Sequence, residues 1–328
     1  MVILTNANGN EIRMLNPTNI DIDLNDTKDF VVTINLNEYK SDLIFGNRLF
    51  IPGTEYGGII GEIETNTEDN SVKIKGYGWR GILYTKIIQP PTGQDYYTIS
   101  GELNNIIKIL TSNLTDLFTT SSVDTGISVN NFQFDRYCTL LDGLNKLLKS
   151  VNYKLNIQYI QGKQGNPGYI ELSAVPIIDY SNDIQFSQDN KILFILKNKQ
   201  NGINHLICLG QGELQDRTVI NLYVDQNGNI GNTQYYTGVQ EIAQTYENTG
   251  GGSEELQVNG TEKLKEIMNK KEMTMDLSNI NTNLEIGDIV GGRDYITGNT
   301  LSTEITNKIY TLNNGEEKIE YEIKGDDA

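Results

Sequence analysis

The sequence contains few of the residues on which most catalytic and metal sites depend. Its 328 residues include two cysteines, one histidine and one tryptophan. Cys138 and Cys208 do not make a disulfide framework, and neither stands in a CxxC motif or at a spacing that zinc uses. We therefore expect both to be small buried apolar residues, and we predict no metal and no cofactor.

Proline, basic residues and long apolar runs are also scarce. Six prolines exclude collagen-like and proline-rich disordered classes. With 26 basic against 43 acidic residues the net charge is -17, which argues against binding to a nucleic-acid backbone. No run approaches the roughly 18 apolar residues that span a bilayer, and the N-terminus lacks the pattern of a signal peptide. We expect a soluble protein made in the cytoplasm.

Residues 1–92 have the pattern of a small all-β unit. Phe30, Val32 and Ile34 alternate with polar or smaller neighbours, the period of a strand with one face on a core. A hairpin is predicted from residues 57–64 through an acidic turn into 72–75. After it, three glycines surround Trp79, whose indole we expect to be buried at the end of this unit.

Residues 93–190 change to an α+β pattern. Apolar residues at helical spacing predict a helix from Leu103 to Leu114, with Ser100 as its N-cap, and a second helix from Thr139 to Val151. A glycine-rich loop then separates two predicted strands, 153–159 and 169–175.

Residues 191–328 return to strands, predicted at 192–197, 205–209 and 218–224. An insertion at 250–275 holds a predicted exposed helix over 254–271, with acids at its start and lysines at its end, as the helix dipole favours. The sequence Asn313-Asn314-Gly315 predicts a final hairpin. The predicted fold class is thus mainly β, with two β-rich domains, 1–92 and 191–328, flanking an α+β domain, 93–190.

The single histidine limits the catalytic arrangements that the chain can build. A Ser-His-Asp or Cys-His site would have to use His205, which stands at the start of a predicted buried strand. We interpret it as a packed, hydrogen-bonded histidine, and we assign no catalytic residue.

Three other patterns resemble ligand-binding motifs. Gly76-x-Gly78-x-x-Gly81 matches a dinucleotide fingerprint, but β-prone residues follow it where a helix is required. Residues 225–229 resemble the start of a calcium loop, but Ile230 replaces the required glycine, so we predict a turn. Asp288 and Asp294 stand in a glycine-rich stretch with ion-pair or metal roles open, although a tight turn explains the glycines more simply.

Several longer stretches resemble one family of proteins. They are the stretches 51–60, 78–81, 90–96, 134–137, 140–144, 203–206, 212–217 and 285–294. In these stretches the chain resembles the siphophage tail-hub, or baseplate-hub, proteins of phages and prophages of Gram-positive bacteria, which are similar in architecture to contractile-tail and type VI secretion hubs.

The resemblance implies a structural role in a virion or tail-like particle. It implies a homotrimer in which the two β-rich domains are β-barrel-like and continue the tail tube around a channel. Its partners would be the tail tube or distal tail protein, a tip or spike protein and the tape-measure protein, with DNA only passing through. Because the sequence ends after the last predicted hairpin, we expect no C-terminal peptidoglycan hydrolase and no enzymatic activity.

One alternative stays open at the level of sequence. The 43 acidic residues offer many carboxylate pairs, and a pair at the right separation would suit a peptidoglycan hydrolase.

Overall fold

The fold is described from a computed structural model of the chain. The structure describes residues 1–25, 29–162, 166–181, 185–186, 194–199, 201–250, 252–275, 283–293, 298 and 300–323.

The chain forms two compact units that differ in size. Unit 1 contains residues 1–185, 276–291 and 304–322, so the C-terminal hairpin folds with the N-terminal half of the chain. Unit 2 contains residues 186–275, 292–303 and 323–328. Strands dominate both units, and among the described residues the sheets are open rather than closed into a barrel.

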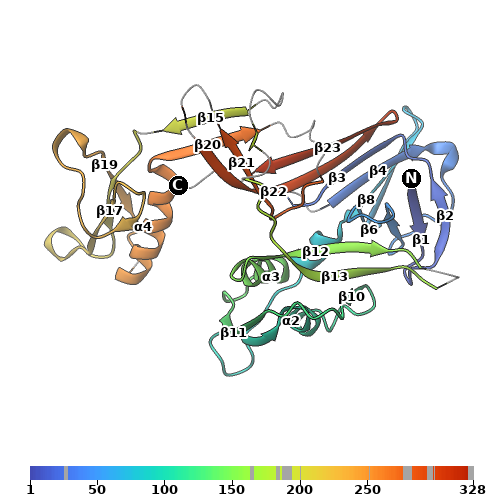
Figure 1. The fold of residues 1–328 in the computed structure, drawn as a ribbon, viewed down its shortest axis with the longest axis horizontal. Helices are drawn as coiled ribbons and strands as arrows, with labels where there is room; N and C mark the ends of the chain where they lie inside the picture. Colours follow the sequence, from blue (N-terminus) through green and yellow to red (C-terminus); the bar gives the residue numbers. More distant parts are fainter. Residues whose placement is uncertain are drawn as a thin grey trace. The chain divides into compact units, whose positions relative to one another are not determined.

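The N-terminal part of unit 1 consists of two sheets around one core. One has the order β2-β1-β5-β6, and the other runs β22-β3-β4-β8-β7, continues beyond β22 through β21 and β14, and carries β23 on β22. In Figure 1 the red C-terminal hairpin lies beside the blue strand β3, which pairs on its other side with β4. The strands are β1 (Val2–Thr5), β2 (Glu11–Leu15), β3 (Asn19–Asp23), β4 (Asp29–Asn35), β5 (Arg48–Phe50), β6 (Gly57–Ile59), β7 (Glu62–Asn66), β8 (Ser71–Tyr77), β14 (Gln185–Phe186), β21 (Ile289–Arg293), β22 (Thr300–Asn313) and β23 (Glu316–Ile323).

The predicted alternation and both hairpins are present in these sheets. Phe30, Val32 and Ile34 are buried on one face of β4, and β7 pairs antiparallel with β8. Asn314 and Gly315 both have positive φ, 50° and 89°, as a two-residue turn between twisted strands requires.

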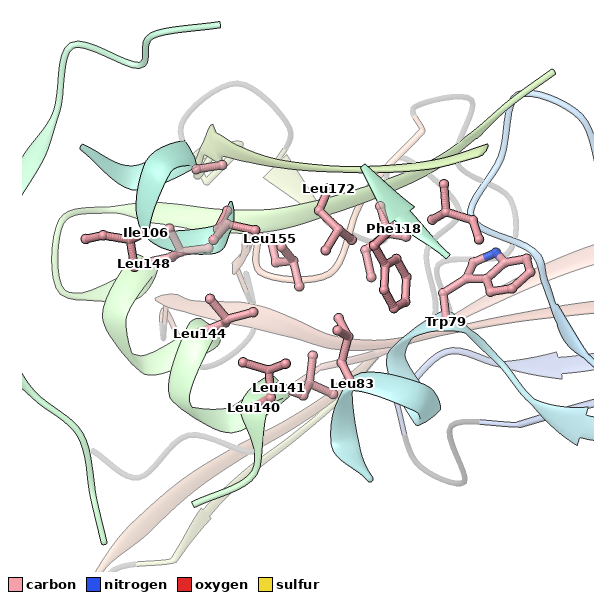
Figure 2. Packing of buried hydrophobic residues seen from close by; sticks show 14 of the residues in the cluster. Trp79, Leu83, Ile106, Phe118, Leu140, Leu141, Leu144, Leu148, Leu155 and Leu172 are labelled. Atoms are coloured by element: carbon pink, nitrogen blue, oxygen red, sulfur yellow. The ribbon is translucent and has the colours of Figure 1, made fainter. Parts of the chain in front are cut away.

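The middle part of unit 1 packs helices on a small sheet of order β10-β13-β12, with a second pair β11-β9. Its core consists mainly of leucine and isoleucine side chains from the helices and from alternate residues of β12 and β13. Figure 2 shows Trp79 and Leu83 among them. The elements are α1 (Trp79–Tyr84), β9 (Thr98–Glu102), α2 (Leu103–Leu110), β10 (Phe118–Thr120), β11 (Ser128–Gln133), α3 (Leu140–Lys149), β12 (Tyr153–Ile160) and β13 (Tyr169–Pro176).

Three predictions in this part were wrong in detail. The glycine motif leads into a short helix, α1, because Trp79 and Leu83 reach the helical core one turn apart. The N-cap of α2 is Glu102, whose carboxylate accepts from the backbone N of Asn105, while Ser100 belongs to β9. The helix ends at Leu110, and a turn over Thr111 precedes Leu114.

Unit 2 packs helix α4 on a sheet of order β18-β17-β16-β19. Gly260 of α4 permits the close approach, since a Cβ there would lie 2.5 Å from Cys208 Sγ. Cys208 is buried as predicted, whereas Cys138 in unit 1 is only half-buried. The elements are β15 (Phe194–Lys199), β16 (His205–Leu209), β17 (Val219–Val224), β18 (Ile230–Gly231), β19 (Ala243–Glu247), α4 (Ser253–Ile267) and β20 (Lys270–Met275).

The predicted helix of the insertion is shorter than expected, and it is not exposed throughout, because Leu256 and Leu264 are buried in the core of unit 2. It ends at Ile267, and the two lysines assigned to its last turn belong to β20, which pairs with β15. Because the residues that follow pair with β15, the helix ends about one turn before the position that its charge pattern predicts.

Candidate functional site

His205 is held between two oxygen atoms at the start of β16. Its Nδ1 lies 2.6 Å from Glu241 Oε1, and its Nε2 lies 2.9 Å from Asn221 Oδ1. The ring stacks on Tyr223 at 4.4 Å between centroids. Both ring nitrogens are thus occupied by structural partners, as predicted for a packed histidine.

The calcium-like segment after β17 is a turn. Asp225 Oδ1 accepts from the backbone nitrogens of Asn227 and Asn229, at 2.8 and 2.9 Å. The pKa of the Asp225 carboxyl is lowered by a hydrogen bond from the Asn229 side chain and by these bonds from backbone nitrogens. Its oxygens serve the turn, and no cluster of three or more metal-ligating side chains occurs among the described residues.

Arg80 and Glu55 form a buried ion pair in unit 1. Arg80 Nε donates to Glu55 Oε1 at 2.5 Å, and Nη2 donates to Oε2 at 3.0 Å. The two side chains are 5% and 10% exposed, and Nη2 also donates to the backbone oxygen of Leu155 in β12. Burial raises the pKa of the Glu55 carboxyl, and the Arg80 guanidinium opposes that shift.

A second buried ion pair joins β12 to the turn before β21. Lys154 Nζ lies 2.6 Å from Asp288 Oδ1, and the Asp288 side chain is 1% exposed. Asp288 also accepts from the backbone nitrogens of Ile178 and Glu285. Gly287, with φ 91°, makes the turn. The ion-pair role open for Asp288 is therefore present, and Asp294 lies outside the described residues.

A third basic residue, Lys308, is buried beside these pairs. Its Nζ lies 3.0 Å from Glu285 Oε1 and 3.0 Å from Asn283 Oδ1. It also lies 5.8 Å from the centroid of the Tyr56 ring. A cavity of about 310 Å³ is lined by Glu55, Glu285 and Lys308 together with residues of β12.

We call these three pairs, Arg80–Glu55, Lys154–Asp288 and Lys308–Glu285, the polar junction. Glu55, Arg80, Glu285 and Asp288 come from three of the stretches that carry the family resemblance, and the fold brings them together within unit 1. The sequence analysis missed Lys154 and Lys308. Their only signal is a position inside a strand next to one apolar residue, Leu155 or Ile309.

None of the described helices is long and apolar enough to cross a membrane. No known family's sequence profile matches the chain, and no curated protein matches its sequence.

Solved structures do resemble the chain in fold. One is the 43 kDa tail protein of prophage MuSo2 from Shewanella oneidensis, with a TM-score of 0.55, 13% identity, and coverage of 99% of this chain and 98% of that one. Another is the prophage tail protein gp18 from Listeria monocytogenes, with a TM-score of 0.51, 12% identity, and coverage of 99% and 94%. The chain therefore has the fold of phage tail proteins.

Proposed function

We propose that this protein is a structural component of a phage tail or tail-like particle and serves as its baseplate or tail-tip hub. The observation that carries the proposal is the fold likeness, which spans 99% of this chain and 98% of a prophage tail protein. A match over the whole length means that the chain has the tail-protein architecture from end to end. The family resemblance in separate sequence stretches supports the hub role.

In the proposed particle, three copies join the tail tube to the tip. The β-rich regions 1–92 and 191–328 would form the barrel-like parts that continue the tube, with 93–190 as a middle domain. The partners would be the tube or distal tail protein, the tip or spike protein and the tape-measure protein. DNA would only pass through the channel, and the protein would act without an active site.

The surface of unit 1 is suited to assembly. Strand β2 is the edge of its sheet and presents Ile12 and Met14, whose exposed fractions are 42% and 55%. Phe45 is 69% exposed. Exposed strand edges and apolar side chains favour association, so they support a role in which other subunits cover them.

We expect the chain to form trimers, either as the purified protein in solution or only when the particle assembles. Light scattering over a concentration series measures the mass in solution, and imaging of the particle gives the symmetry at the hub. A three-fold ring supports the proposal. Two or six copies at that position would contradict it.

A peptidoglycan hydrolase is the second candidate function, because the cavity at the polar junction contains two carboxylates, Glu55 and Glu285. In the structure both carboxylates bind structural cations, Arg80 and Lys308. This arrangement leaves neither poised to transfer a proton to a substrate.

The purified chain should therefore release no muropeptides from peptidoglycan, with a known muramidase as positive control. Release that disappears in Glu285→Gln would establish the hydrolase and refute the structural role. Glu285 is the better residue to change, since its side chain is 41% exposed and the variant should fold.

A further inference from the structure

One arginine of unit 1 is buried without an acidic partner. Arg48 belongs to β5 and is 5% exposed. Its Nη2 donates to two backbone oxygens, that of Ala7 and, at 3.0 Å, that of Asp116. Among the described residues no carboxylate forms an ion pair with it, unlike the basic residues of the polar junction. A buried charge without a counter-charge is costly, so this position requires an explanation.

Three polar atoms at this position lack hydrogen-bond partners. They are Arg48 Nε, the Thr5 hydroxyl and the Tyr159 hydroxyl, and none of them is accessible to solvent. Thr5 and Tyr159 are 0% and 1% exposed. Buried donors in folded proteins are almost always satisfied. Three unsatisfied donors beside a buried charge therefore indicate a partner that the described part of the chain does not supply.

The strand register brings these three side chains to one place. Thr5 of β1 is the cross-strand partner of Arg48, so both side chains lie on the same face of the sheet. Phe50 lies on that face too, two residues along β5, and the Tyr159 ring stacks on it with 3.4 Å between centroids. The hydroxyls of Tyr159 and Thr5 are neighbours without a well-formed hydrogen bond. Burial raises the pKa of Tyr159 to about 12, and Arg48 and Thr5 oppose that shift.

Two loops cover the site. The loop between β1 and β2 supplies the Ala7 oxygen that binds Arg48. The loop before β13 joins it, because the Gly168 nitrogen donates to the Gly9 oxygen at 3.0 Å. A Cβ on Gly168 would lie 2.2 Å from the Tyr159 hydroxyl, so the glycine permits this close approach. The site is thus closed to a carboxylate carried on another protein segment.

Acidic residues outside the site do not neutralise it. Asp116 attracts Arg48, and Glu11 acts on Tyr159, but both acidic residues are exposed, and water and salt screen their charges. Burial has the larger effect on Arg48 and lowers the pKa of its guanidinium.

We propose that a small monovalent anion of the size of chloride binds between Arg48, Thr5 and Tyr159. An anion accepts hydrogen bonds from the guanidinium Nε and from both hydroxyls, and it supplies the missing counter-charge. A water molecule would accept such bonds but would leave the charge uncompensated. The anion would connect β1, β5 and β12, and it would join the N-terminal sheet of unit 1 to its middle part. This inference does not depend on the proposed hub role.

Bromide identifies the anion directly, because it replaces chloride and scatters X-rays anomalously. Crystals of the full chain in sodium bromide should show an anomalous peak within hydrogen-bonding distance of Arg48 Nε. Water at that position, or no density, would overturn the proposal. A peak without any effect of chloride in solution would mean binding at crystal concentration only, which also overturns it.

Thermal unfolding measures the same binding in solution. Chloride is raised to about 200 mM while sodium gluconate keeps the ionic strength constant. A ligand that binds only the folded state raises the melting temperature, and we expect a rise of about 4 °C or more for the wild type. An equal rise with sulfate at the same ionic strength would mean a general salt effect and overturn the proposal.

Arg48→Met and Arg136→Met form a matched pair of variants. Both remove an arginine charge, but Arg136 is exposed. Chloride should raise the melting temperature of Arg136→Met as much as that of the wild type, and it should have little effect on Arg48→Met. Thr5→Val removes one donor at similar volume, so its response should be smaller than that of the wild type. If Arg48→Met does not fold, Thr5→Val and the bromide crystal decide. An unchanged response in either site variant would contradict the assignment.

Discussion

Glu55→Gln is expected to lower the free energy of unfolding by about 3 to 5 kcal/mol. The substitution preserves shape but leaves the Arg80 guanidinium, 5% exposed, without its counter-charge. A buried charge that loses its partner costs far more than the pair contributes, because the desolvation of the remaining ion is no longer offset. Urea unfolding followed by circular dichroism measures the change.

Two further variants isolate the cause. Glu62→Gln also removes a carboxylate from an ion pair, but Glu62 is 62% exposed, so its effect should stay within about 1 kcal/mol. Glu55→Leu with Arg80→Met removes both buried charges and should be more stable than Glu55→Gln. If Glu55→Gln and Glu62→Gln lower the free energy of unfolding equally, the Arg80–Glu55 pair of the polar junction does not stabilise the fold electrostatically.

Trp79→Ala should cost a similar amount, about 3 to 5 kcal/mol, through the cavity that it leaves. The indole is 1% exposed and lies in the core with Leu83, Leu141 and Phe118 (Figure 2). It also approaches Tyr159, at 6.5 Å between ring centroids. Thermal unfolding should show a large drop in melting temperature.

The control for this substitution is Tyr77→Ala, two residues earlier, where the side chain is 56% exposed and should contribute little. Trp79→Phe should be less damaging than Trp79→Ala, since it refills much of the volume. It also removes an indole N–H for which no described residue is an acceptor. An unchanged melting temperature for Trp79→Ala would mean that the ring does not pack as described.

The effect of Trp79→Ala should extend to helix α3. Trp79 and Leu83 of α1 share a core with Leu140, Leu141 and Leu144 of α3. A loosened core should therefore lower the stability of α3 as well as that of α1.

Local sequence patterns were enough to predict the elements that are specified by residues close together in the chain. The Asn-Gly turn between β22 and β23 requires positive φ at two successive residues, and few sequences other than Asn-Gly supply it. Helix α3 begins after Thr139, which accepts from the backbone nitrogen of Asp142, and its leucines recur at the helical period. Such signals lie within a few residues of one another, so the sequence alone reveals them.

Helix α1 could not be predicted in this way. Its six residues include β-prone side chains, and an isolated helix of that length is not stable in water. It forms because its buried face, with Trp79 and Leu83, packs into a core that also contains leucines of α3, more than fifty positions later. Tertiary packing decides the conformation of such a short segment.

The sequence by itself determined the mainly β class, the positions of most strands and helices, and the absence of a histidine-based or cysteine-based catalytic motif. The tertiary structure decided which charged side chains are buried and which residue each of them pairs with. Arg80 pairs with Glu55 and Lys154 with Asp288 across separations of 25 and well over a hundred residues, and each position taken alone reads as an ordinary surface charge. Burial and pairing depend on distant segments meeting in space, and one-dimensional spacing does not contain that information.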